Sequence, residues 1–168
     1  MRFSLALIFA LAAAAQTPGT MEDRARQYLL DLIRLDSTNP RGNETILVVE
    51  DSATVRHMAV GILRTLGYSV HEAEDGVAAL EILKGPLKID LLFTDLIMPK
   101  GIDGQELSRR ARALRPKLKA LFTSGYSEQF LKGRGSAEAG VPLLNKPYRT
   151  RALAEAVRGV LDAPQSVG

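Results

Sequence analysis

From residue 45 onward, short unbroken apolar runs alternate with longer stretches in which apolar side chains recur at helical spacing. The run Thr45–Val49 reads TILVV, which predicts a strand buried on both faces, as in a parallel sheet. Residues 52–66 then predict an amphipathic helix that Gly67 closes. The side chains expected on its buried face are Val55, Met58, Ala59, Ile62, Leu63 and Leu66.

The same strand and helix alternation repeats four more times. The further strands are expected at Tyr68–Ala73, Leu91–Thr94, Ala120–Thr123 and Val141–Leu144. The further helices are expected at Val77–Leu83, Gln105–Leu114, Glu128–Ala139 and Arg151–Leu161. Because crossovers between parallel strands are right-handed, this pattern predicts an α/β fold with a five-stranded, parallel, doubly wound sheet and helices on both faces.

The first 44 residues have a different pattern from the rest of the chain. Residues 1–20 combine Arg2, an apolar run and the small residues Ala13–Ala15, which is typical of a secretory signal peptide; a hydrophobic N-terminal helix is the alternative. Residues 21–44 predict a short amphipathic helix and a linker. The expected organisation is therefore a leader at 1–20, this helix and linker at 21–44, one domain at 45–163 and a tail at 164–168.

Composition excludes several classes of protein. The 168 residues are 46% hydrophobic and include no Cys, which excludes a disulfide scaffold, a thiol nucleophile and a zinc site with Cys ligands. No apolar stretch reaches the roughly 18 uninterrupted residues of a membrane span, so stable membrane insertion is not expected. The net charge is only +3, and the basic run between Arg109 and Lys119 lacks interleaved aromatic residues. We therefore expect no nucleic-acid partner.

Candidate chemistry lies at the carboxyl ends of the predicted strands, where sites form in such sheets. Three carboxylates crowded together repel one another unless a cation intervenes, and carboxylate oxygens suit Mg²⁺. A magnesium ion beside an ammonium and a hydroxyl forms a phosphoryl-binding set, and a central carboxylate can act as the nucleophile that forms an acyl phosphate. The side chains at these ends are Glu50, Asp51, Asp95, Thr123, Ser124 and Lys146.

Residues 45–162 resemble the receiver domain of bacterial two-component response regulators. The matching segments are ILVVEDSATVR, DLLFTDLIMPKGIDGQEL, ALFTSGYS and LLNKPY. The resemblance implies a flavodoxin-like fold with strand order 2-1-3-4-5, and a signalling domain rather than an enzyme, although such domains can catalyse their own phosphorylation and dephosphorylation. The long loop Pro99–Gly104, with TSGYS and NKPY, is similar to receivers attached to hybrid histidine kinases.

The resemblance also implies a role for each candidate residue. Asp95 would accept phosphate from a phosphohistidine on a histidine kinase or a histidine phosphotransfer protein. Mg²⁺ would be bound by the acid pair Glu50 and Asp51, by Asp95, and by the backbone carbonyl of Ile97. A conformational change would then alter the docking of partners, and the domain would be a monomer or a weak phosphorylation-dependent dimer.

The phosphoryl group would be contacted by Lys146, which a cis bond is expected to join to Pro147, and by the hydroxyl of Ser124. Thr123 is the less favoured source of that hydroxyl. Leu143 stands where many members of the family carry Tyr or Phe. This departure leaves open a second hypothesis, a receiver-like protein-binding module that works without phosphorylation.

Residues 29–44 resemble the start of zinc-dependent hydrolases of the aminoacylase and acetylornithine-deacetylase type. A secreted hydrolase fragment is therefore a remote alternative, but the resemblance contains no catalytic residue and no metal-ligand cluster follows it. A receiver acts in the cytoplasm, where its kinase lies, whereas a signal-like leader implies export. The two expectations for localisation conflict.

Overall fold

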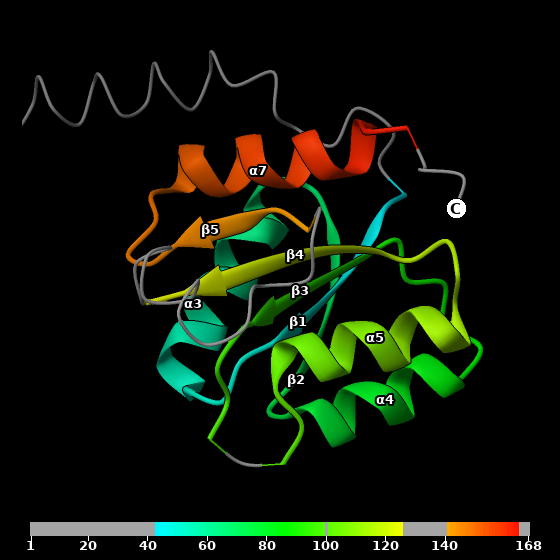
Figure 1. Cartoon of the computed structure of the whole chain (residues 1–168). Helices are drawn as coiled ribbons and strands as arrows, with labels where there is room; N and C mark the ends of the chain where they lie inside the picture. Colours follow the sequence, from blue (N-terminus) through cyan, green and yellow to red (C-terminus); the bar gives the residue numbers. More distant parts are fainter. Residues whose placement is uncertain (1–42, 100, 126–140, 165–168) are drawn as a thin grey trace, which may run out of the picture. The chain divides into compact units, whose positions relative to one another are not determined.

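The computed structural model describes residues 43–99, 101–125 and 141–164. Five parallel strands form one sheet in the order β2-β1-β3-β4-β5, which confirms the doubly wound sheet (Figure 1). The strands are β1 (Thr45–Val49), β2 (Ser69–Ala73), β3 (Leu91–Asp95), β4 (Lys119–Ser124) and β5 (Leu143–Asn145). The helices are α3 (Ala53–Thr65), α4 (Gly76–Lys84), α5 (Gly104–Leu114) and α7 (Thr150–Asp162).

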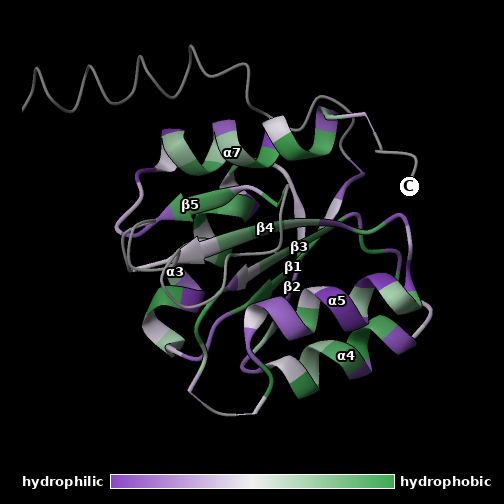
Figure 2. Cartoon of the chain, in the orientation of Figure 1, coloured by the Kyte–Doolittle hydropathy of each residue, from purple (hydrophilic) through white to green (hydrophobic). Residues whose placement is uncertain are grey.

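Alternate residues of the central strands face two different helical layers. Leu47, Val49 and Leu92 pack in one buried cluster with residues of α4 and α5, which lie side by side (Figure 1). The intervening residues Val48 and Phe93 are almost completely buried and point to the other face, since successive side chains of a strand alternate. Figure 2 shows β3 and β5 as mainly hydrophobic and α5 with a hydrophilic outer surface.

Two details of the sequence prediction are corrected by the structure. The side chain of Met58 is 46% exposed, because α3 is buried through Ala59, Val60 and Leu63. At 100° per residue, Met58 lies roughly 140° from the centre of that face. The last strand begins at Leu143 rather than Val141; Pro142 has no N–H to donate to a ladder and contributes only its carbonyl, which accepts from Phe122.

Several expectations fall outside the described residues: the leader at 1–20, most of the segment 21–44, the helix at 128–139 and residues 165–168. Among the residues that the structure describes, no helix is long and apolar enough to cross a membrane. At the start of this region the side chain of Glu44 is buried and paired with Arg158 of α7.

Candidate functional site

Three carboxylates meet at the carboxyl edge of the sheet. Glu50 and Asp51 directly follow β1 and Asp95 ends β3, so the sheet order places them on adjacent strand ends. One carboxylate oxygen from each lies within 4.8 Å of the other two. Glu50 is buried, Asp95 is half-buried and Asp51 is exposed. Exposure therefore increases from Glu50 through Asp95 to Asp51 within the described part of the chain.

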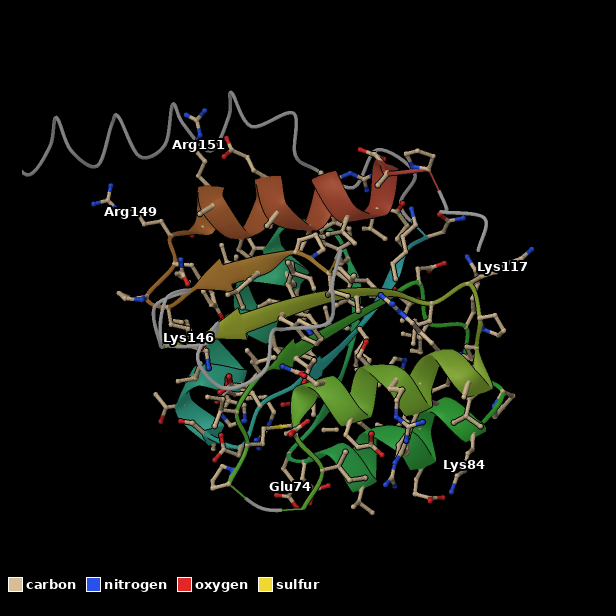
Figure 3. All side chains as sticks on the ribbon, in the orientation of Figure 1. Glu74, Lys84, Lys117, Lys146, Arg149 and Arg151 are labelled. Carbon is tan, nitrogen blue, oxygen red and sulfur yellow. The ribbon has the colours of Figure 1, made fainter. Side chains whose placement is uncertain are left out.

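Lys146 supplies the positive charge in this cluster. Its Nζ donates to Glu50 Oε2 at 2.6 Å and to Asp95 Oδ2 at 2.8 Å. Figure 3 labels this side chain beyond the end of β5, and its backbone N–H donates to the carbonyl of Ser124 at 2.7 Å. The peptide bond that joins Lys146 to Pro147 is cis, as the family resemblance implied. One ammonium thus bridges two of the three acids.

Burial and charge shift the pKa of two of these groups, Glu50 and Lys146. Burial raises the pKa of Glu50 above 4.5, and the hydrogen bond and charge of Lys146 only partly oppose this. Burial by itself lowers the pKa of Lys146, but its hydrogen bonds to Asp95 and Glu50 outweigh that effect and raise it above 10.5. The ammonium is therefore held in its charged form, ready to contact an anion.

The backbone after β3 holds Asp95 in place. The N–H of Ile97 donates to Asp95 Oδ1 at 3.3 Å, and the N–H of Leu96 donates to the carbonyl of Thr123 at 2.8 Å. Gly104 approaches so closely that a Cβ there would lie 2.2 Å from the carbonyl oxygen of Asp95. The sequence therefore needs glycine at the start of α5 for Asp95 to keep this position.

Two hydroxyl groups end β4. Thr123 pairs with Asp95 in the β3–β4 ladder and Ser124 pairs with Asn145 in the β4–β5 ladder. Both are 1% exposed, and Thr123 Oγ1 has no hydrogen-bond partner within the described part of the chain. Both residues that the sequence proposed as hydroxyl donors thus lie at the strand end next to the acids.

Leu143 packs beside the site rather than in it. It is partly buried against a small cluster of Leu96 and Phe122, which Ile97 and Val141 also contact. Leu143 therefore connects β5 with the segment that follows Asp95, through apolar contacts.

Sequence reasoning missed one residue that contacts the site, Arg56, and one that packs near it, Tyr148. Arg56 of α3 donates from Nη1 to the carbonyl of Glu50 at 2.7 Å and from Nε to Glu72 Oε2 at 3.3 Å. Tyr148 is 9% exposed, and its ring packs edge-on against Phe93 with centroids 6.1 Å apart. The segments ILVVEDSATVR and NKPY contain both residues, but no spacing rule predicts these contacts.

The donor set fits a magnesium ion. Carboxylate oxygens within 4.8 Å of one another are hard ligands, and of the three acids Asp51 is exposed and Asp95 is half-buried. The buried carboxylate of Glu50 has a raised pKa, which a divalent cation would counter. Lys146 contacts one oxygen each of Glu50 and Asp95, and the second oxygen of each group accepts a hydrogen bond of 3.3 Å from a backbone N–H, which leaves it lone-pair capacity for a metal ion.

Comparison with known proteins identifies the family. Residues 46–158 match the model of the response regulator receiver domain. The chain is 38% identical over 127 residues to the sensor kinase CckA of Brucella abortus, and the match covers 75% of this chain but only 13% of that kinase. It is 35% identical over 118 residues to the response regulator receiver protein CpdR of the same organism, covering 70% of this chain and 97% of CpdR.

Solved structures agree. The receiver domain of the hybrid histidine kinase CckA is 42% identical, with a TM-score of 0.58 over 70% of this chain and 98% of that domain. A response regulator receiver protein from Sinorhizobium medicae is 28% identical, with a TM-score of 0.64 over 72% of this chain and 96% of that protein. Strand order, strand-end acids and sequence similarity agree, and the chain belongs to the family of response regulator receiver domains of two-component phosphorelay systems.

Proposed function

We propose that Asp95 is the phosphoacceptor of this receiver domain. The observation that carries the proposal is the position of its carboxylate, which Lys146 contacts at 2.8 Å and which lies within the cluster of Glu50 and Asp51. A carboxylate oriented by fixed donors and flanked by a cation can attack an electrophilic phosphorus.

The proposed reaction is an in-line phosphoryl transfer. One Asp95 oxygen attacks the phosphorus of a phosphohistidine, a P–O bond forms, and the P–N bond breaks with its electron pair passing to the imidazole nitrogen, which then takes up a proton from solvent. Lys146 and the hydroxyl of Ser124 contact the new phosphoryl oxygens. The N–H of Ile97, at 3.3 Å from Asp95 Oδ1, fixes the direction of attack.

Glu50, Asp51, Asp95 and the backbone carbonyl of Ile97 would hold Mg²⁺ in this proposal. The bound ion supplies positive charge beside the phosphoryl oxygens, where it lowers the repulsion between the incoming anion and the three acids. Because the chain's own residues position donor, acceptor and Lys146, a small acyl phosphate can replace phosphohistidine, and the domain would catalyse its own phosphorylation and dephosphorylation.

A histidine kinase or a histidine phosphotransfer protein is the proposed partner. The similarity to receivers of hybrid kinases and to CpdR supports this, since the matched kinases carry such a domain within a much longer chain. This partner places the proposed reaction in the cytoplasm. The alternative function is a binding module that works without phosphorylation. It is supported by Leu143, which stands where the family resemblance leads one to expect Tyr or Phe.

The experiment compares the wild type with Asp95→Asn after incubation with acetyl phosphate and Mg²⁺, read by intact mass. The matched control is Asp75→Asn, at a half-buried acid whose side chain accepts from the Ala78 N–H at 2.8 Å. Asn can cap a helix as Asp does. The wild type and the control should gain one phosphoryl group and Asp95→Asn none.

Equal labelling of Asp95→Asn and the wild type would place the acceptor at another residue. A wild type that stays unlabelled with every phosphodonor, while still binding its partner, would favour the phosphorylation-independent module.

A further inference from the structure

Tyr148 carries a buried hydroxyl without a hydrogen-bond partner in the described part of the chain. The residue is 9% exposed, and its ring is held edge-on against Phe93 at an interplanar angle of 71°. An unpartnered buried hydroxyl destabilises a fold by about 1–3 kcal/mol, so its retention calls for a reason.

The Tyr148 ring packs on the side of the sheet that also carries two site acids. Phe93 pairs with Val48 of β1, and side chains two residues further along each strand return to the same face. Asp95 follows Phe93 by two residues, and Glu50 follows Val48 by two. The N–H of Glu50 donates to the carbonyl of Ala73 at 3.3 Å, which continues the hydrogen bonding between β1 and β2 as far as Glu50. Glu50 and Asp95 therefore share the face on which Tyr148 packs.

Burial and nearby negative charge both favour the protonated form of the Tyr148 hydroxyl. Burial, followed by the negative charges of Glu50 and Asp95, raises the pKa of Tyr148 to about 12. At neutral pH the phenol is therefore a hydrogen-bond donor in the field of two carboxylates, the groups that accept most strongly.

Glu50 needs such a donor whenever Lys146 leaves it. Its Oε2 accepts from Lys146 at 2.6 Å, while its Oε1 accepts from the Ser52 N–H at the long distance of 3.3 Å. The Glu50 side chain is 6% exposed, so solvent reaches it poorly. If Lys146 turns to a phosphoryl group, as the proposed function requires, Oε2 loses its donor, and a Mg²⁺ ion that takes one Glu50 oxygen would still leave the other oxygen in need of a donor.

We propose that Tyr148 is a positioning residue whose hydroxyl donates to the Glu50 carboxylate when Lys146 moves from Glu50 to the phosphoryl oxygens. In the resting state Lys146 satisfies Glu50, and the phenol has no hydrogen-bond partner among the described residues. In the phosphorylated state the phenol holds Glu50 in place. The role in the phosphorylated state rests on the proposed function. The energetic coupling between Tyr148 and Lys146 can be tested without it.

That coupling is measurable by thermal unfolding without any phosphate. The full chain is compared as the wild type, Tyr148→Phe, Lys146→Met and the double variant, all in the same buffer and at the same pH. Tyr148→Phe should leave Tm unchanged or raise it in the wild type, because an unpartnered hydroxyl is removed. In the Lys146→Met background the same change should lower Tm by roughly 3–8 °C.

The matched control is Tyr68→Phe. Tyr68 is also buried, but its hydroxyl is 3.5 Å from Arg158 Nη1, which is paired with Glu44 and not with the site acids Glu50, Asp51 and Asp95. Its effect on Tm should be the same with and without Lys146. An effect of Tyr148→Phe that is equally independent of Lys146 would overturn the proposal.

A second measurement uses beryllofluoride with Mg²⁺ as the phosphoryl analogue. Tyr148→Phe should weaken beryllofluoride binding by about tenfold or more, as expected for the loss of one hydrogen bond to a charged group, and Tyr68→Phe should leave it unchanged. Unchanged binding in Tyr148→Phe would contradict the proposal. A wild type that binds no beryllofluoride would overturn the proposed function, while the unfolding comparison would still decide the Tyr148 coupling.

Discussion

Gly104→Ala tests how closely the fold holds the phosphoacceptor strand. An added Cβ would lie 2.2 Å from the Asp95 carbonyl oxygen and 3.0 Å from the Leu96 Cα, both backbone atoms that cannot rotate away. Gly104 also donates its N–H to the carbonyl of Leu96 at 3.1 Å. The start of α5 must therefore move away from the end of β3.

The magnitude follows from three contributions. Overpacking against backbone destabilises by about 1–3 kcal/mol. Loss of the Gly104 N–H bond destabilises by about 1 kcal/mol more. The higher helix propensity of alanine returns about 1 kcal/mol. The free energy of unfolding should therefore fall by about 1–3 kcal/mol.

Urea unfolding followed by circular dichroism measures this change. Gly159→Ala is the matched control, because Gly159 lies within α7, is exposed, and has nothing within 4 Å of an added Cβ. It should raise the free energy of unfolding by about 0.5–1 kcal/mol. The two substitutions thus have opposite predicted signs. If Gly104→Ala were as stable as the wild type, the close approach to Asp95 would be wrong.

Three further predictions test other parts of the account. Burial raises the pKa of Glu50 above 4.5, so the favourable contribution of the protonated Glu50 to stability is fully present below pH 4.5 and is lost as pH rises through the folded-state pKa. Urea midpoints measured across this pH range should therefore fall less for Glu50→Gln than for the wild type. Replacing Glu50 and Asp51 together by amides should weaken Mg²⁺ binding by at least about tenfold in calorimetry, since two hard ligands are removed; undiminished binding would place the ion elsewhere. We also propose that residues 1–42 are dispensable for folding, so the chain without them should still unfold in one cooperative thermal transition. Deleting residues 1–44 should lower the free energy of unfolding by about 1–3 kcal/mol more, because it removes Glu44 from the partly buried Arg158. Equal stability of the two truncations would contradict the importance of this ion pair.

Much of the fold could be predicted from the sequence because local pattern and tertiary role agree. Thr45–Val49 is apolar throughout, and a strand in the middle of a parallel sheet is buried on both faces, so pattern and position coincide. The site acids could be located for the same reason, since they follow such strands directly. Met58 was misplaced because helical spacing allows several overlapping faces, and only packing against the sheet selects one.

Contacts between distant segments could not be predicted. The hydrogen bond from Arg56 to the Glu50 carbonyl depends on the angle at which α3 leaves β1. The position of Tyr148 depends on the path of the chain after β5 and on the ring of Phe93, which lies 55 positions earlier (148 − 93). Hydrophobic periodicity carries no information on either.

The most direct test of the central claim is to locate the phosphoryl group chemically. The chain is incubated with a phosphorylated histidine phosphotransfer domain and Mg²⁺, the acyl phosphate is reduced with borohydride, and the peptides are sequenced by mass spectrometry. We predict homoserine at position 95, formed only when both Mg²⁺ and the donor are present. A phosphoryl group found on another residue, such as His57 or His71, with Asp95 unmodified, would contradict the account.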